Sequence, residues 1–291
     1  MSKQERIGLI GMGLVGTALA KRLLAANYAV RSYDLAEKAR ARAHGLGVEV
    51  MPDAQAVAEG ASWLLLSLFD SNSRRQLLWG AQALAAALAP GTVVLDTTTG
   101  APADFVEDAA RLAPQGVRLV DVCLSGSSQV VERGESIALI GDTAEAAAGY
   151  APLLAAFCKA QYHTGAAGQG TRLKLIVNLV FGLHRAVLAE ALNLAVRSGF
   201  ELPLVLEVLK SGETYSVAMD TKGPKMIAGV YEPAVARLAQ HAKDVELILH
   251  YAAEVGARVP LSEAHALLIR AAVAAGHGGL DNAAILKAYL P

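Results

Sequence analysis

The hydrophobic positions of this chain follow two different patterns. In the first part, short apolar runs alternate with segments of helical periodicity, which is typical of a parallel sheet covered by helices. After Gly165, every periodic segment predicts helix and no strand pattern is convincing. The change predicts an α/β domain over residues 1–164 and an all-α domain over residues 165–291.

The apolar runs of the first part predict strands at residues 6–10, 28–33, 48–51, 63–68, 92–95, 117–123, 137–140 and 161–163. The periodic segments between them predict helices at residues 17–26, 54–59, 74–88, 103–112 and 144–157. In the second part the pattern predicts helices at residues 170–197, 203–211, 216–226, 234–255, 262–275 and 282–289. The run at 63–68 is apolar without alternation, as expected for a central strand covered on both faces.

The segment from Gly165 to Gly199 predicts one long helix. It contains no proline, and a helix of about 30 residues would be about 45 Å long, enough to span a domain. Residues 175–183 are apolar on nearly every face, so we expect this part to be buried from several sides. Lys174 directly precedes this run and Asn178 lies within it, and their spacing of four residues places them on one face of the helix. Burial of an ammonium group costs free energy, so Lys174 needs a partner or a purpose.

A glycine turn follows the first predicted strand. Gly11 permits the tight turn, Gly13 lets the backbone approach a pyrophosphate, and Gly16 lets helix and strand pack closely. The second predicted strand ends at Asp34, near where an acidic residue binds the adenosine ribose of a dinucleotide. Strand, glycine turn, helix and acidic residue together predict a Rossmann domain. We expect cofactor contacts from the turn residues Gly11, Met12, Gly13, Leu14, Val15 and Gly16 and from Asp34.

The residues after Asp34 bear on the choice between NAD and NADP. They are Leu35, Ala36 and Glu37, so no arginine directly follows to hold a 2′-phosphate. This predicts a preference for NAD, and Lys38 and Arg40 keep NADP possible.

Other candidate positions lie where predicted strands end. Leu68 and Phe69 follow one central strand and residues 97–99 follow the next, at the edge of such a sheet where ligands bind. The threonines at 97–99 also suit a second role, capping of the helix at 103–112. The loop Ser125-Gly126-Ser127 offers N–H groups and hydroxyls for an anion, although the same composition is ordinary for a turn. Lys243 stands beside Asp244 and could simply be solvated.

Composition and charge exclude several classes of function. The formal net charge of −1 gives no electrostatic case for nucleic acid or an anionic membrane. Cys123 and Cys158 have neither metal-ligand spacing nor a disulfide framework, so we expect two buried thiols and no metal. The polar start of the chain is unlike a signal peptide, and charged residues interrupt the long helix, so we expect a cytoplasmic protein without a membrane span.

The order of these motifs resembles the β-hydroxyacid dehydrogenase family, which includes 3-hydroxyisobutyrate dehydrogenase and tartronate semialdehyde reductase. The glycine turn, the Ser125-Gly126 loop and the Lys243-Asp244 pair contribute to the resemblance. The run from Gly168 to Asn178, of the form Gly-x-Gly-x-x-x-Lys-x-x-x-Asn, is its specific part. The resemblance covers nearly the whole chain. It implies a Rossmann domain, a helical domain and a substrate site between them.

The resemblance also implies roles for individual residues. Lys174 would be the catalytic general acid and base, and Asn178 would orient the substrate. The loop residues Ser125, Gly126 and Ser127 would bind the substrate carboxylate. Thr99 would contact the nicotinamide half of the cofactor, and Lys243 would border cofactor and substrate, with Leu68 and Phe69 also at the cofactor.

Departures from the family pattern leave the substrate open. The family usually has glycine at Ser127, asparagine at Val177, proline at Phe69 and methionine at Val15. Ser127 and Val177 would border the substrate, so a 3-hydroxyisobutyrate-like acid, tartronate semialdehyde and a sugar acid all remain candidates.

Three other functions agree less well with these residues. An imine reductase usually lacks the lysine at 174, and a 6-phosphogluconate-type enzyme would need a longer helical domain and more basic residues. A nucleotide-binding protein without activity would have no need for the combination of Lys174, Asn178 and Ser125. The apolar long helix also predicts a homodimer or homotetramer, because one helical domain of this size leaves much of the helix uncovered.

Overall fold

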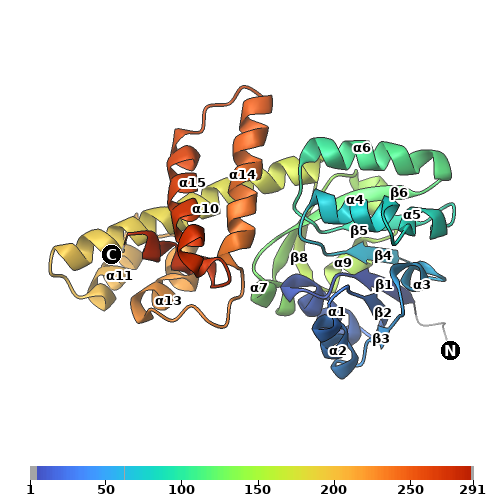
Figure 1. Ribbon diagram of the computed structural model, residues 1–291, viewed down its shortest axis with the longest axis horizontal. Helices are drawn as coiled ribbons and strands as arrows, with labels where there is room; N and C mark the ends of the chain where they lie inside the picture. The colour runs from blue at the N-terminus through green and yellow to red at the C-terminus, as the bar shows by residue number, and fades with distance from the viewer. Residues whose placement is uncertain (1–4, 62, 290–291) are drawn as a thin grey trace. The chain divides into compact units, whose positions relative to one another are not determined.

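The computed structural model describes residues 5–61 and 63–289 (Figure 1). Its contacts divide the chain into two units, Met1–Lys174 and Leu175–Pro291. Among the described residues, the first unit contains the whole sheet, and the second is helical apart from one isolated bridge between Arg237 and Asp281. The predicted fold class, a Rossmann domain followed by an all-α domain with one long helix, is confirmed.

The first unit is built on one sheet with the strand order β3-β2-β1-β4-β5-β6-β7-β8. All neighbouring strands are parallel except β6 and β7, which are antiparallel. The chain order reverses between β1 and β4, so the carboxyl ends of these two strands form the switch point at which such sheets bind ligands. The strands are β1 Arg6–Ile10, β2 Ala29–Tyr33, β3 Glu49–Val50, β4 Trp63–Leu66, β5 Val93–Asp96, β6 Arg118–Ser125, β7 Ser136–Ile140 and β8 Cys158–His163.

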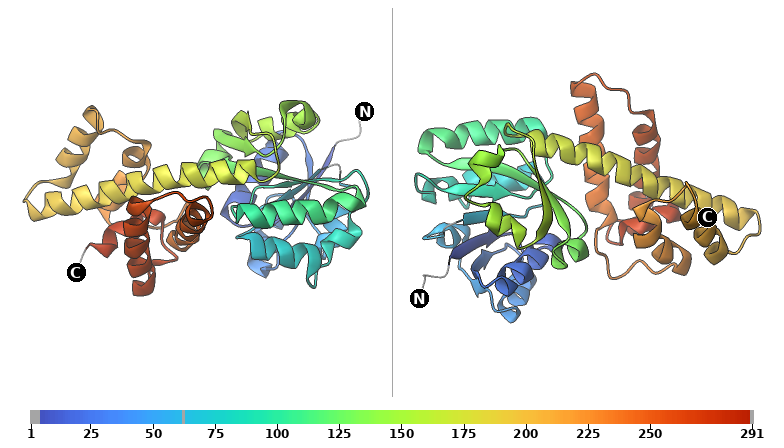
Figure 2. Two further views of the ribbon diagram at one scale, coloured as in Figure 1. Left: turned by 90° about the horizontal axis from the view of Figure 1, so that it is seen from above. Right: turned by 180° about the vertical axis from the view of Figure 1, so that it is seen from behind.

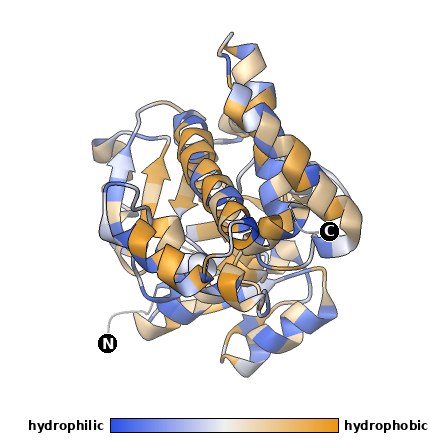
Figure 3. Cartoon of the chain, turned by 90° about the vertical axis from the view of Figure 1, so that its left-hand side faces the viewer, coloured by the Kyte–Doolittle hydropathy of each residue, from blue (hydrophilic) through white to orange (hydrophobic). Residues whose placement is uncertain are grey.

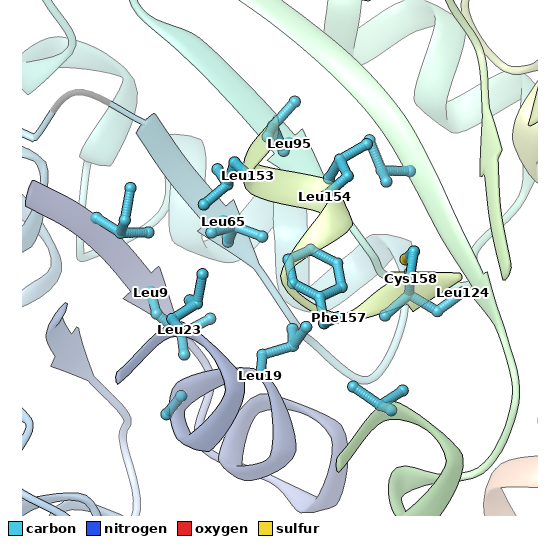
Figure 4. Close-up of a cluster of buried hydrophobic side chains, with 14 of the residues drawn as sticks. Leu9, Leu19, Leu23, Leu65, Leu95, Leu124, Leu153, Leu154, Phe157 and Cys158 are labelled. Atoms are coloured by element: carbon cyan, nitrogen blue, oxygen red, sulfur yellow. The ribbon is translucent and has the colours of Figure 1, made fainter. Parts of the chain in front are cut away.

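Helices cover both faces of this sheet, and the alternation along β4 shows the division. Leu65 belongs to one buried cluster, while Leu64 and Leu66 belong to the other. The first cluster draws on α1 Leu14–Ala25, α2 Glu37–Gly45, α7 Ser128–Glu132, α8 Ala144–Ala147 and α9 Ala151–Ala155 (Figure 4). The second draws on α3 Ala54–Ala58, α4 Ser71–Trp79, α5 Leu84–Ala87 and α6 Pro102–Leu112. Burial on both faces explains why the central strands are continuously apolar.

Two helices predicted for the first unit are broken in the structure. The segment 74–88 forms α4 and α5, which are separated at Gly80, where a Cβ would lie 2.5 Å from the carbonyl oxygen of Gln76. The segment 144–157 forms α8 and α9. Pro152 in the first turn of α9 has no N–H to continue a helix from α8. In both segments the apolar residues keep a helical spacing on either side of the break, so the pattern predicted one continuous helix.

The second unit contains the greater part of α10 and five further α-helices. These are α10 Gln169–Arg197, α11 Leu202–Ser211, α12 Val217–Thr221, α13 Gly223–Ala228, α14 Leu238–Glu254 and α15 Pro260–Ala272, followed by a π turn at Val273–His277 and a 3₁₀ helix at Asn282–Ala288 (Figure 2). The predicted helix 216–226 is divided at Lys222, ahead of Pro224. The predicted start of α14 at residue 234 is also wrong. Its first N–H groups, of Leu238 and Ala239, bond to the carbonyls of Leu280 and Gly278.

The long helix α10 is less buried within this chain than its sequence predicts. Ile176 is 55% and Val180 46% exposed, so burial of residues 175–183 from several sides is wrong for a single copy of the chain. By length and composition alone α10 could cross a membrane, a test that core helices also pass. Its buried residues include Lys174 and Arg185, which a membrane span disfavours. Figure 3 shows apolar and polar bands alternating along the helices of the second unit.

Candidate active site

The glycine turn between β1 and α1 is packed directly against the end of β4. Gly11 has a φ of 95°, and a Cβ there would lie 2.2 Å from the carbonyl oxygen of Ser67. A Cβ on Gly16 would lie 1.9 Å from the carbonyl oxygen of Gly11. Both positions therefore require glycine because the chain itself occupies the space, as the sequence predicted.

Gly13 differs from the other two glycines of the turn. No described atom lies within 4 Å of a Cβ built there, so this side of the turn is open. Gly13 is also the N-cap of α1, and within the described part of the chain no side chain caps that helix end. Free N–H groups at the start of a twelve-residue helix, beside an open glycine, form a cradle that suits a phosphate. Leu14 and Val15 are half-buried beside it.

Asp34 stands at the end of β2 with its carboxylate held by the main chain. Its Oδ2 accepts a hydrogen bond from the N–H of Met12 at 2.6 Å, and its Oδ1 accepts one from Ala36 at 2.8 Å. A carboxylate has further lone pairs, so it can still accept ribose hydroxyls. The side chain of Met12 is fully buried, which leaves only its backbone near a ligand.

Two arginines stabilise this loop, and the sequence indicated only one of them. Arg40 donates to the carbonyls of Asp34 and Leu35 at 2.7 and 2.9 Å. Arg42, which the sequence reasoning missed, donates to the carbonyl of Met12 and to the hydroxyl of Thr17. No local signal marks Arg42, because its contacts are formed across the turn from a different helix.

The residues that follow β4 and β5 are held to each other. Thr97 donates its hydroxyl to the carbonyl of Leu66 at 2.8 Å, and the hydroxyl of Thr98 accepts from the N–H of Leu68 at 3.1 Å. The expected capping of α6 by these threonines is wrong, because its N-cap is Ala101 and carries no side-chain cap. Thr99 is half-buried, and Phe69 is half-exposed at the same edge of the sheet.

The Ser125-Gly126-Ser127 loop joins β6 to α7. Gly126 has a φ of 143°, which favours glycine, and a Cβ there would lie 2.8 Å from Val130. Ser127 is the N-cap of α7 and its Oγ accepts from the N–H of Val130. Ser125 is half-buried. The loop is an ordinary turn in its backbone, and its serine hydroxyls still have protons to donate.

Lys174 lies in the second turn of α10 and is 8% exposed. The start of that helix is anchored to β6 through Asp121. Its carboxylate accepts from the N–H of Gly168 at 3.0 Å, from the N–H of Thr171 at 2.6 Å and from the hydroxyl of Thr171 at 3.0 Å. Asp121 was not among the residues predicted from the sequence. Its signal was an acidic residue inside an otherwise apolar strand.

Cys123 lies between the start of α10 and the loop that follows β5. Its Sγ is 3.7 Å from the hydroxyl of Thr171 and 3.8 Å from the carbonyl oxygen of Thr98. The pKa of this thiol is raised to about 12, mainly by burial and then by the charge of Asp121, while the hydrogen bond with Thr171 and the charge of Lys174 oppose the rise. Both charged groups therefore lie within electrostatic reach of one buried thiol. Cys123 and Cys158 are free and buried, as predicted.

In the second unit, Asn178 and Lys243 both interact with Asp244. The Nδ2 of Asn178 donates to Asp244 Oδ2 at 3.0 Å, and the Nζ of Lys243 lies 3.0 Å from Asp244 Oδ1. Because Asp244 accepts from the amide nitrogen, the Oδ1 of Asn178 is turned away from it. The side chain of Lys243 is only 15% exposed, so a freely solvated lysine is not what the structure shows. From the sequence, Asp244 was expected only as the neighbour of Lys243.

Among residues 5–61 and 63–289, no group of three or more His, Cys, Asp and Glu side chains could hold a metal ion. The candidate residues therefore comprise a dinucleotide-type turn, polar strand ends, a buried lysine and an amide.

Comparison with known proteins places these features in a family. The profile of the NAD-binding domain of 6-phosphogluconate dehydrogenase matches residues 6–165. A profile described as NAD-binding of NADP-dependent 3-hydroxyisobutyrate dehydrogenase matches residues 168–289. An L-threonate dehydrogenase of Cupriavidus necator is 30% identical over 286 residues, which is 98% of this chain and 96% of that protein.

Solved structures agree with these matches. The crystal structure of a 3-hydroxyisobutyrate dehydrogenase from Salmonella typhimurium has a TM-score of 0.89 at 25% identity and covers 98% of this chain and 99% of its own. An imine reductase from Myxococcus stipitatus, solved as a variant with NAD⁺, has a TM-score of 0.62 at 20% identity over 99% of this chain and 100% of its own, and shares the fold alone. The chain is an enzyme of the oxidoreductase class that acts on CH–OH groups, and it belongs to the β-hydroxyacid dehydrogenase family.

Proposed function

We propose that this protein interconverts a small β-hydroxyacid and its semialdehyde or ketone, with Lys174 as general acid and base. The observation that supports this most strongly is a lysine that is 8% exposed at the anchored start of α10, one turn before Asn178. A buried ammonium is retained against its desolvation cost, and proton transfer is a function that explains it. We propose that residues 1–164 bind the cofactor, that residues 165–291 complete the substrate site, and that the enzyme is cytoplasmic.

The residues of the first unit fit a bound dinucleotide. The open Gly13 and the uncapped start of α1 suit the pyrophosphate, and the carboxylate of Asp34 suits the adenosine ribose hydroxyls. Phe69 and Thr99 would border the nicotinamide half, and Lys243 would contribute from the second unit. When bound, the nicotinamide supplies the hydride acceptor or donor.

The side chains then move one proton and hold the substrate. In the oxidation, the Nζ of Lys174 takes the proton of the β-hydroxyl while the C–O bond becomes a carbonyl, and in the reduction it returns that proton. The amide nitrogen of Asn178 is bound by Asp244, so its Oδ1 is available to accept from the ammonium group of Lys174, one turn earlier, and to fix the geometry of that group. The hydroxyls of Ser125 and Ser127 and the N–H groups of their loop would bind the substrate carboxylate.

The test is a panel of small acids with both cofactors. We expect NAD-linked oxidation of at least one of 3-hydroxyisobutyrate, glycerate and threonate, or reduction of tartronate semialdehyde, followed by NADH absorbance. We also expect kcat/KM with NAD to exceed that with NADP by about tenfold or more, because Asp34 would lie unpaired beside a 2′-phosphate. Tight NAD binding with no turnover on any of these acids would favour the alternative of a nucleotide-binding protein without activity.

The variant Asp34→Ser supplies the matched comparison for the cofactor. It should lower kcat/KM with NAD and reduce or reverse the preference over NADP, because Arg40 already lies beside this position. Arg31→Ala is the control. Arg31 is bound to Glu49 at 2.8 Å, and its loss should leave the preference as it was.

The outer face of α10 supports a homodimer or homotetramer. Ile176, Val180, Val187 and Leu194 recur at helical intervals and are 46 to 66% exposed. We propose that a second copy of the chain covers this stripe, because two such helices would bury identical apolar faces against each other.

Light scattering with size exclusion tests this proposal. The wild type should have a mass of two or four chains, and Val187→Glu with Leu194→Glu should lower it, because two buried carboxylates would oppose the contact. Val106→Glu, on α6 in the first unit and 40% exposed, is the control that should leave the mass unchanged. A monomeric wild type at micromolar concentration would contradict the proposal.

A further inference from the structure

Asp121 is a fully buried acidic residue in the interior of β6. Its neighbours in that strand are apolar, and both faces of the strand are covered. On the adjacent strand the partner in register is Asp96, which is bound by Arg74 at 2.9 Å. Asp121 instead accepts from the neutral donors of Gly168 and Thr171.

Two glycines approach this carboxylate closely. A Cβ on Gly141 would lie 1.8 Å from Asp121 Oδ1, and a Cβ on Gly170 would lie 3.0 Å from Oδ2. The same Cβ on Gly170 would lie 2.5 Å from the carbonyl oxygen of Leu139. Two glycines thus allow the start of α10 to pack against β6 and β7 with Asp121 between them.

Burial makes this carboxylate costly. It raises the pKa of Asp121, and the hydrogen bonds from Thr171 and Gly168 only partly offset the rise. A raised pKa means that the ionised form is less favourable in the folded protein than in water, so Asp121 subtracts from stability at neutral pH. A residue that costs stability and is nevertheless enclosed so tightly calls for a functional explanation.

Lys174 supplies that explanation. It follows Thr171 by three positions, so the two side chains share one face of α10. The hydroxyl of Thr171 lies 3.0 Å from Asp121 and 3.7 Å from the Sγ of Cys123. Asp121 and Cys123 are two positions apart on β6 and so face the same side of the strand, toward the turn of α10 that carries Thr171 and Lys174.

We propose that Asp121 is the positioning residue of Lys174: it anchors the first turn of α10 and supplies a fixed negative charge that sets the pH at which the lysine exchanges its proton. The proposal rests on the proposed function for its catalytic meaning, while the interaction between the two charges can be measured without any substrate. The charges that act on Cys123 include those of Asp121, Lys174 and Asp96, and Asp96 is already paired with Arg74.

The first experiment is a titration of Lys174 by NMR with 13Cε-labelled lysine, assigned by the signal lost in Lys174→Met. In Asp121→Asn, Lys174 should titrate about one pH unit lower than in the wild type, because an opposite charge that favoured the ammonium is gone. Thr171→Val removes one hydrogen bond to Asp121 and keeps the charge of that carboxylate. The midpoint of Lys174 should therefore shift less than half as far in this variant as in Asp121→Asn. Equal midpoints in wild type and a folded Asp121→Asn would overturn the proposal.

A reciprocal measurement avoids dependence on the folding of Asp121→Asn. The 13Cγ signal of Asp121 should titrate at higher pH in Lys174→Met than in the wild type, since coupling between two charges is mutual. An unchanged midpoint there would also overturn the proposal.

Steady-state kinetics test whether the charge of Asp121 affects the reaction itself. In the direction of hydroxyacid oxidation, Asp121→Asn should move the acid limb of the kcat profile to lower pH and change KM less than about twofold. On the plateau above that limb, where Lys174 is unprotonated in both proteins, kcat should fall at least tenfold, because the first turn of α10 has lost its anchor. A merely structural residue would leave that limb in place, and this outcome would contradict the proposal. A wild type without turnover would contradict the proposed function and leave the two NMR titrations to decide the role of Asp121.

Discussion

Lys174→Ala should lose about a thousandfold or more in kcat and still bind NAD. General acid and base catalysis by a positioned side chain contributes about a hundredfold to ten-thousandfold to rate, and Lys174 is the only proton carrier assigned here to the hydroxyl. The cofactor contacts proposed for Gly13 and Asp34 lie on other elements, so the affinity for NAD should change little. Single-turnover kinetics and a fluorescence titration with NADH measure the two quantities separately.

The matched control for this variant is Arg172→Ala. Arg172 lies two positions earlier on α10, is half-buried, and faces a different side of the helix from Lys174. It should keep kcat within about threefold of the wild type. If Lys174→Ala retains near-normal turnover, the assignment of the proton carrier is wrong, whatever Arg172→Ala does.

Gly16→Ala should destabilise the first unit and abolish NAD binding. The added Cβ would lie 1.9 Å from the carbonyl oxygen of Gly11, and neither main-chain segment is free to withdraw, because Gly11 is itself against Ser67. A main-chain overlap of this kind costs about 3–5 kcal/mol, which corresponds to a fall of roughly 10 °C in the melting temperature. Differential scanning calorimetry measures this change.

Gly13→Ala provides the comparison within the same turn. A Cβ at Gly13 meets no described atom within 4 Å, so the variant should melt within about 2 °C of the wild type. It should nevertheless bind NADH about tenfold more weakly, because the new methyl group would occupy the open side where the pyrophosphate is proposed to lie. Normal affinity in a folded Gly13→Ala would contradict the assignment of the cradle.

Local sequence patterns predicted those features that depend on neighbouring residues. The glycine turn was predictable because each glycine answers a steric demand between positions a few residues apart. The sheet was predictable because buried strands are apolar without alternation. The breaks at Gly80 and Pro152 were missed because the apolar period continued through them, although both residue types are known helix breakers.

The electrostatic surroundings of the site were not predictable in this way. Arg42 contacts the carbonyl of Met12 from 30 positions away, and Asp121 binds Thr171 across 50 positions. The bond from Asn178 to Asp244 joins residues 66 positions apart. No periodicity or spacing contains these pairings, because they arise only when separate elements are packed together.

The fold class, the dinucleotide-type turn and the lysine in the first turns of a long apolar helix can all be predicted from the sequence. Hydrophobic periodicity and the steric demands met by glycine both act over a few residues, so they can be recognised in the sequence alone. The packing of the chain was needed to show that Lys174 is buried, that a buried carboxylate anchors the start of its helix, and that one stripe of that helix is exposed in a single chain. Burial and charge depend on what other segments bring to the same point in space, and that information is distributed over the whole chain.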